Sequence, residues 1–177
     1  GSTFKLFTYL EALERGLKPS DAVSCAPLDW GGQAYASGCG GLLSLRSAFA
    51  SSSNTAALRL ARRLGLEPVA ARARAMGITT PLEPVPGLVL GQAEVRLLEL
   101  TAAYAAVANG GVWHAPSTIR LLTDGESRAG ATRGRSMLNP GRRVVSATTA
   151  TQMQELLRAV VRSGTGRAAS LGGQEGG

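Results

Sequence analysis

Residues 1–17, GSTFKLFTYLEALERGL, carry the apolar pattern that decides the fold class of this chain. Apolar side chains recur at every third position, at Phe4, Phe7, Leu10 and Leu13. This spacing places them on one face of a helix, so the stretch predicts an amphipathic helix over residues 2–15. Gly16 follows directly and is a suitable residue to end it.

Ser2 and Lys5 stand three residues apart and share one face of this helix. A serine at a helix start can cap a free backbone N–H with its hydroxyl. The same hydroxyl becomes a nucleophile when a base lies beside it, and a buried lysine can act as that base, whereas arginine stays protonated. The chain has seventeen arginines and only one other lysine, Lys18, so the choice of lysine at this position is informative. The local sequence leaves both roles of Ser2 open.

Helical patterns recur along the rest of the chain. We expect further helices over residues 43–50, 55–65, 67–76, 93–111 and 147–164. In the strongest of them one face holds Leu97, Leu100, Tyr104 and Val107. Residues 17–43 are rich in proline and glycine and predict a loop or small hairpin. Residues 119–122 and 143–146 predict two short strands joined by a polar loop. The expected fold class is therefore mainly α with short β hairpins.

Composition excludes some classes of function. The 177 residues are 44% apolar, enough for the core of one domain, and no apolar run reaches the 18 residues of a membrane span. The formal net charge is +7, but the arginines are scattered and lack interleaved aromatic residues or a recognisable reading helix. We therefore expect a solvated, arginine-rich surface and no nucleic-acid partner.

Cys25 and Cys39 bracket a glycine-rich stretch, CAPLDWGGQAYASGC. No second cysteine pair or partnering histidine accompanies them, which argues against a zinc site. Two unrelated buried thiols and a disulfide that closes a hairpin remain equally open, because the redox compartment decides between them.

Residues 51–54, SSSN, interrupt two predicted helices. Ser52 and Asn54 on this loop can supply a hydroxyl for a proton path and an amide that grips a peptide. Ser53 or Asn54 can equally be the N-cap of the following helix. These two interpretations also remain open on local grounds.

Taken together, GSTFKLFTYLEALERGL and LRSAFASSSNTAALRLARRLG resemble the transpeptidase domain of class A penicillin-binding proteins, which pair an S-x-x-K helix with an S-x-N loop and a K-T-G strand. The similarity continues through MGITTPLEPVPGLVLGQAEVRLLELTAAYAAVANGG and reaches RAVVRSGTGRAA. It implies that residues 1–177 are a partial transpeptidase domain that starts at the S-x-x-K helix. The chain would then be the helical half of an α+β fold whose central sheet lies largely outside it.

The resemblance implies an acyl transfer that cross-links peptidoglycan stem peptides, with no cofactor and no metal. Ser2 would be the nucleophile, Lys5 its base and Ser52 a proton relay, and Asn54 would bind the substrate amide. β-Lactam antibiotics would acylate the same serine. The implied partners are stem peptides, β-lactams, and the rest of a parent transpeptidase domain with its glycosyltransferase domain. The implied location is the cell envelope, at the outer face of the cytoplasmic membrane or in the periplasm, with the membrane anchor outside this chain.

The K-T-G element is the departure from the family pattern, because we expect the chain to stop just before that strand. Residues 162–165, RSGT, imitate it with arginine in place of lysine, but they continue a predicted helix and run into turn residues. We therefore do not assign the motif to them, and we expect little turnover from this chain alone. Two alternatives stay open: a serine β-lactamase or D,D-carboxypeptidase, and a catalytically inactive helical scaffold or binding module of the envelope.

Overall fold

The structure, a computed structural model, describes residues 1–117, 121–123, 134–136 and 140–169. The described part is mainly helical, as predicted, and its strands form two-stranded antiparallel pairs. The helices are η1 (Ser2–Phe4), α1 (Lys5–Glu14), α2 (Leu45–Ala50), α3 (Asn54–Leu64), α4 (Leu66–Ala75), α5 (Pro86–Val89), α6 (Leu97–Ala108), α7 (Ala147–Ser163) and η2 (Arg167–Ala169).

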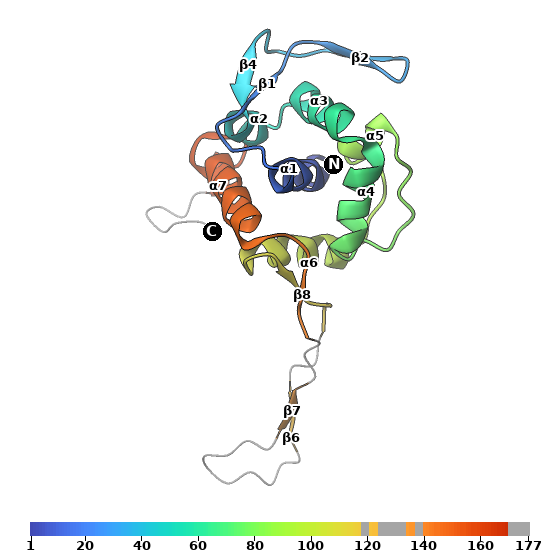
Figure 1. The fold of residues 1–177 in the computed structure, drawn as a ribbon, viewed down its shortest axis with the longest axis vertical. Helices are drawn as coiled ribbons and strands as arrows, with labels where there is room; N and C mark the ends of the chain where they lie inside the picture. Colours follow the sequence, from blue (N-terminus) through green and yellow to red (C-terminus); the bar gives the residue numbers. More distant parts are fainter. Residues whose placement is uncertain (118–120, 124–133, 137–139, 170–177) are drawn as a thin grey trace.

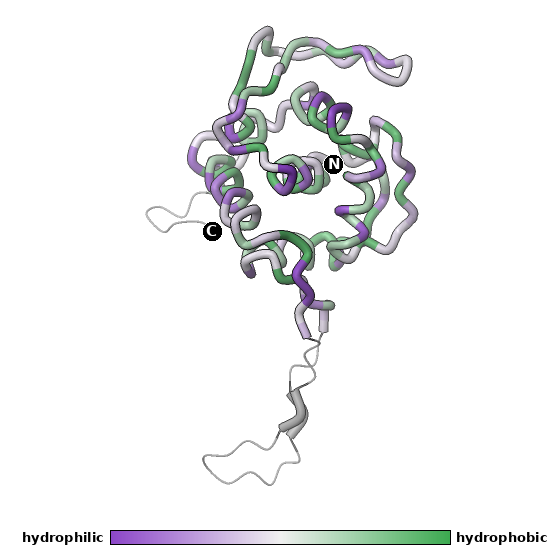
Figure 2. The backbone as a smooth tube through the Cα atoms, viewed as in Figure 1, coloured by the Kyte–Doolittle hydropathy of each residue, from purple (hydrophilic) through white to green (hydrophobic). Residues whose placement is uncertain are grey.

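Helix α1 lies at the centre of the fold and the other long helices surround it (Figure 1). It packs against α2, α3, α4 and α7, and each residue from Lys5 to Leu13 is buried. The apolar stripe predicted for residues 2–15 is buried as expected, although the first turn is a 3₁₀ helix. Gly16 follows the helix with φ +93°, a conformation that glycine adopts without strain. Figure 2 shows apolar and polar residues alternating along the surrounding helices, as amphipathic helices around a buried one require.

An ion pair fastens α1 to α4 inside the fold. Arg72 donates from Nε and Nη2 to Oε2 of Glu11, at 3.0 and 2.9 Å, and its Nη1 donates to the carbonyl of Val144 at 2.6 Å. Arg15 donates to the other carboxylate oxygen of Glu11 at 2.8 Å. Because Glu11 is buried, these donors compensate a carboxylate that water does not reach.

Residues 17–43 form the predicted hairpin region. Strand β1 (Ala22–Ser24) pairs with β4 (Leu42–Ser44), and β2 (Leu28–Trp30) pairs with β3 (Gln33–Tyr35) around a two-glycine turn. Gly31 and Gly32 both have positive φ, the geometry that a two-residue hairpin turn requires. Cys25 and Cys39 are joined by a disulfide, so of the two alternatives for this pair the hairpin-closing bridge is present and free thiols are not.

Several predicted boundaries were wrong. The helix expected over 43–50 begins at Leu45, because residues 42–44 pair with β1 as a strand. The helix expected over 93–111 spans only Leu97–Ala108, since Arg96 is extended and Glu99 accepts hydrogen bonds from Thr79. Leu97, placed on the apolar stripe, is 79% exposed.

The strand predictions after α6 were partly correct. Strand β5 (Val112–Trp113) pairs with β8 (Arg142–Arg143), and β6 (Leu121–Thr123) pairs with β7 (Gly134–Ser136). Residues 119 and 120 of one predicted strand lie outside the described residues. The other was expected over 143–146, but only Arg143 of that range belongs to β8, because Val144 and Val145 are buried in the core. Ser146 then caps α7, which spans the expected range.

Candidate active site

Ser2 is the first residue of η1, and it lies exposed at the entrance to the central helix. Neither η1 nor α1 has a side-chain cap, so the N-cap interpretation of Ser2 is wrong. Its Oγ instead lies 3.1 Å from Nζ of Lys5. The hydroxyl is therefore both open to a substrate and in contact with an amine.

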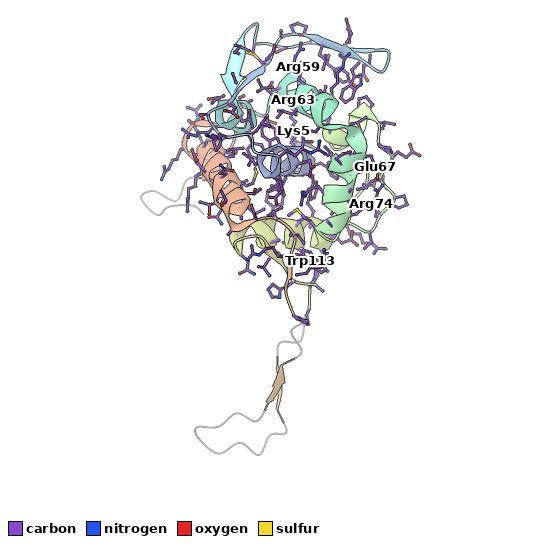
Figure 3. The ribbon with its side chains drawn as sticks, in the orientation of Figure 1. Lys5, Arg59, Arg63, Glu67, Arg74 and Trp113 are labelled. Carbon is purple, nitrogen blue, oxygen red and sulfur yellow. A yellow bond between two sulfur atoms is a disulfide. The ribbon has the colours of Figure 1, made fainter. Side chains whose placement is uncertain are left out.

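Lys5, labelled in Figure 3, is the first residue of α1. Only 2% of it is exposed. Its Nζ contacts four oxygens that come from two segments of the chain. They are Ser2 Oγ at 3.1 Å, Ser52 O at 2.7 Å, Ser52 Oγ at 2.9 Å and Asn54 Oδ1 at 2.6 Å. The structure thus brings together Ser2, Lys5, Ser52 and Asn54, the residues selected from the sequence.

Burial lowers the pKa of Lys5 from 10.5 to about 8, because the ammonium form loses its hydration. A neutral amine has two N–H groups and one lone pair. Ser52 O and Asn54 Oδ1 can only accept, so they match the two N–H groups. The lone pair is then free to accept from the hydroxyl of Ser2. This arrangement suits a general base.

Adjacent residues in the turn before α3 have different roles: one caps the helix and its neighbours contact Lys5. Ser53 is the N-cap of α3 and accepts from the backbone N–H of Ala56 at 3.3 Å, so the capping alternative was correct for Ser53. Asn54 is the first helical residue, and its side chain is directed to Lys5 instead. Ser52 adopts φ +55°, which brings both its carbonyl and its hydroxyl onto the same amine. A non-glycine residue in this region is strained, and such strain is concentrated at functional sites.

Two contacts that sequence reasoning missed hold the turn that carries Ser2. Tyr104 of α6 donates its hydroxyl to the carbonyl of Thr3 at 2.9 Å, and burial raises the pKa of Tyr104 to about 12. Gly91 packs closely against the same turn, since a Cβ at Gly91 would collide with the backbone of Gly1. Tyr104 lay on a predicted apolar stripe, and no local signal distinguished its hydroxyl from a core position.

A cavity of about 340 Å³ opens beside the Ser52–Asn54 turn. Its opposite wall is formed by Ala36, Ser37, Gly38 and Cys39 from the segment that the disulfide closes. The lining is rich in hydroxyl groups, which suits a neutral, polar ligand chain.

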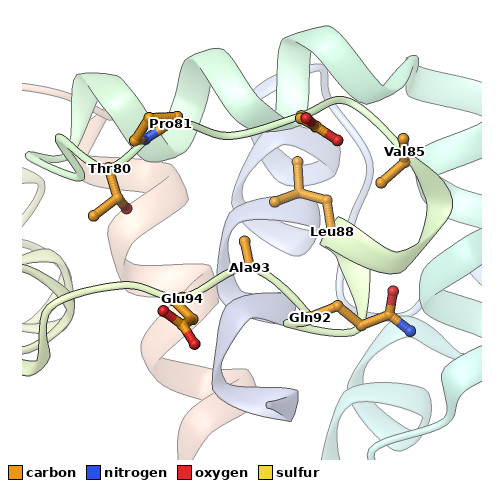
Figure 4. A pocket seen from close by; sticks show the side chains of 8 residues that line it. Thr80, Pro81, Val85, Leu88, Gln92, Ala93 and Glu94 are labelled. Carbon is orange, nitrogen blue, oxygen red and sulfur yellow. The ribbon is translucent and has the colours of Figure 1, made fainter.

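A second cavity of about 470 Å³ lies apart from these residues, between the Thr80–Val85 segment and the Gln92–Glu94 segment (Figure 4). Glu83 and Glu94 line it, and none of the four predicted site residues does.

Residues 162–165 form the end of a helix and the turn after it, as expected, and not a strand. Arg162 and Ser163 end α7, and Gly164 is its C-cap. Among the described residues no group of histidine, cysteine, aspartate or glutamate side chains could hold a metal ion. Within the same residues, no helix combines the length and apolar character of a bilayer span.

Comparison with known proteins gives a consistent match. The family model of the penicillin-binding protein transpeptidase domain matches residues 1–177. Penicillin-binding protein 1A of Rickettsia typhi is 33% identical over 133 residues, which cover 70% of this chain and 17% of the relative. Penicillin-binding protein 1A of Aquifex aeolicus is 34% identical over 133 residues, which cover 70% of this chain and 18% of the relative.

Solved structures share the fold. Penicillin-binding protein 3 from Mycobacterium tuberculosis in complex with aztreonam aligns with a TM-score of 0.81 at 25% identity, covering 97% of this chain and 45% of that one. The imipenem acyl-enzyme complex of penicillin-binding protein A from M. tuberculosis aligns with a TM-score of 0.78 at 25% identity, covering 98% and 46%. The chain thus spans less than a fifth of these two curated relatives and about half of these two solved structures.

Proposed function

The chain belongs to the family of penicillin-binding protein transpeptidase domains, and on that premise we propose that it carries the nucleophile side of a peptidoglycan D,D-transpeptidase. The observation that supports this most directly is the buried Lys5 amine, which contacts Ser2 Oγ, Ser52 Oγ and Asn54 Oδ1 together. A structural lysine would also need acceptors, but it would not need the exposed hydroxyl of Ser2 among them.

In the proposed first step, Lys5 accepts the Ser2 hydroxyl proton while Oγ attacks the carbonyl carbon of the penultimate D-alanine in a stem peptide. The new bond joins Oγ to that carbon, and the carbon–nitrogen bond to the terminal D-alanine breaks. The leaving amine needs a proton. Ser52 Oγ lies 2.9 Å from Lys5 Nζ, so Ser52 can relay the proton from the lysine.

In the proposed second step, the amine of a neighbouring stem peptide attacks the acyl carbon and loses a proton to the same relay. The bond between that carbon and Ser2 Oγ breaks, Oγ takes a proton back from Lys5, and the cross-link and free Ser2 result. Asn54 directs Oδ1 to Lys5, which leaves its amide hydrogens to donate to a substrate carbonyl. The backbone N–H of Ser2, at the start of η1, would be one oxyanion donor. A β-lactam would acylate Ser2 through the first step alone. Two of the solved structures with this fold are described as complexes with aztreonam and imipenem.

The K-T-G motif is absent from these 177 residues. Since the chain spans about half of the solved structures it matches, we propose that a strand elsewhere in the whole protein supplies that motif and the second oxyanion donor. Losing one oxyanion donor costs about 10²–10³ in rate, so residues 1–177 alone should acylate slowly. The rest of the domain and a glycosyltransferase domain are its proposed partners, in the cell envelope.

The test is covalent labelling by a fluorescent penicillin. We expect labelling of the whole protein that contains this chain, and its loss in Ser2→Ala. Ser20→Ala is the matched control, because Ser20 is an exposed serine in the turn before β1 and does not line the cavity beside the site. Labelling that persists in Ser2→Ala would refute Ser2 as the nucleophile.

Penicillin labelling and a second assay with a stem-peptide substrate together separate the alternatives. Rapid release of the label would favour a β-lactamase, and release of D-alanine without cross-linked product would favour a carboxypeptidase. A folded whole protein that neither labels nor cross-links would favour the inactive scaffold.

A further inference from the structure

The Cys25–Cys39 disulfide lies at the edge of the candidate site, although it takes no part in the proposed chemistry. Cys25 follows β1 and is completely buried. Cys39 is partly exposed and lines the 340 Å³ cavity that Ser52 and Asn54 also line. The bridge spans 14 positions in sequence, and the segment it closes contains the β2–β3 hairpin.

The Cys25 end of this bridge is fixed to helix α3. Thr55, the residue after Asn54, donates its buried hydroxyl to the carbonyl of Cys25 at 2.8 Å. Arg59, one turn further along α3, donates to the carbonyls of Ala26 and Pro27 at 3.2 and 2.7 Å. The backbone at Cys25 therefore moves with the start of α3, where Asn54 contacts Lys5.

The Cys39 end forms the opposite wall of the cavity. The Ser37 hydroxyl accepts from the backbone N–H of Cys39 and donates to its carbonyl, both at 3.0 Å, so the hydrogen bonds of these two residues join them to each other. These bonds do not join the turn to the rest of the fold. Two residues further on, the Gly41 carbonyl accepts from the backbone N–H of Cys25 at 3.0 Å, where β4 begins to pair with β1. The disulfide holds the Cα atoms of Cys25 and Cys39 5.6 Å apart and fixes the turn itself, on the cavity side of that pairing.

We propose that the Cys25–Cys39 disulfide is a positioning element of the site, which clamps the Ser37–Cys39 turn against the Ser52–Asn54 turn. This clamp keeps water from the Lys5 amine, and it holds the side chains of Ser52 and Asn54 in contact with that amine. It also sets the width of the cavity that a neutral peptide chain would enter. The effect on acylation rests on the proposed function, whereas the effect on Lys5 does not.

The direct test observes Lys5 by NMR in the chain labelled with ¹³C at lysine Cε. Because the chain has only two lysines, Lys18, which is exposed, serves as the internal reference. In Cys25→Ser/Cys39→Ser we expect the Lys5 signal to move and its titration midpoint to rise by about one pH unit, as water enters the site. An unchanged Lys5 signal and midpoint in the folded variant would overturn the proposal.

Thr55→Val decides the question if the double serine variant does not fold. It keeps the disulfide and the side-chain shape but removes the bond to Cys25 O. In this variant too, we expect the titration midpoint of Lys5 to rise. In the whole protein that contains this chain, we expect about a tenfold lower rate of acylation by a fluorescent penicillin. Thr55→Ser, which keeps the hydroxyl, should restore both. A Thr55→Val protein with an unchanged Lys5 signal would count against the clamp.

Asp29→Ala is the matched control, because Asp29 is exposed in β2 within the disulfide-closed segment and does not line the cavity. We expect it to leave the Lys5 signal in place; a shift as large as that of the double variant would refute a specific clamp. If penicillin labels no variant of the whole protein that contains this chain, including the unmodified one, the transpeptidase proposal fails. The Lys5 signals still decide the role of the disulfide.

Discussion

The rate at which a penicillin acylates Ser2 should follow the deprotonation of Lys5. With the pKa lowered by burial to about 8, roughly 9% of the amine is neutral at pH 7. At the ordinary value of 10.5 the neutral share would be only about 0.03%, so burial raises it roughly 300-fold. The protein thus gains a usable base near neutral pH.

The expected profile follows from those fractions. The second-order rate constant of acylation should rise about fivefold from pH 7 to pH 8 and level off near pH 9, at about tenfold above its pH 7 value. The measurement is stopped-flow or gel-based labelling with a fluorescent penicillin across pH 6 to 10.

Two results would refute the reasoning behind this profile. A rate that keeps rising tenfold per pH unit up to pH 10 would mean an amine that is not desolvated. A flat profile would mean that Lys5 is not the base. Lys5→Arg is the companion variant, because arginine keeps the charge but does not deprotonate, and it should lower the rate by about 10²–10⁴.

Three further predictions concern stability, measured by urea unfolding. Lys5→Met should raise the free energy of unfolding below pH 8, because the folded state disfavours the ammonium form of Lys5. This gain over the unmodified chain should shrink as pH rises from about 8 to 10.5, where the folded chain already holds the neutral amine. A gain that grows over that range would contradict the direction of the pKa shift. Ser52→Gly should be about 1 kcal/mol more stable than Ser52→Ala, since glycine adopts φ +55° without strain, and equal stability would argue against a strained turn. Arg72→Met should cost about 3–5 kcal/mol because it strands the buried Glu11 carboxylate, and a loss under 1 kcal/mol would show that Arg15 suffices.

The helices could be predicted because their signal is local. Periodic apolar residues identified α1, α3, α4 and α7 to within a few positions. The failures lie where a distant segment overrides the local pattern. Residues 93–96 carry a helical pattern but lie outside the helix. Arg96 is extended, and the first turn of α6 is tied through Glu99 to Thr79, twenty positions earlier.

At the candidate site, too, some features follow from the local sequence and others from contacts between distant segments. The sequence supplied Ser2, Lys5, Ser52 and Asn54, because hydroxyl, amine and amide at those spacings suit acyl transfer and resemble a known family. It left the capping role between Ser53 and Asn54 undecided, since either side chain can cap α3. The fold resolved this by placing Lys5 within 2.6 Å of Asn54, 49 positions away in sequence.

The sequence by itself thus determined which side chains are candidates for the site, where most of the helices lie and which family the pattern resembles. Only the tertiary structure decided that Lys5 is buried, that Ser52 turns both its oxygens to the amine, and that Cys25 and Cys39 are joined. The physical reason is one of range. Helical periodicity depends on neighbours three and four residues apart, whereas desolvation and hydrogen bonding at Lys5 depend on atoms that folding brings from dozens of residues away.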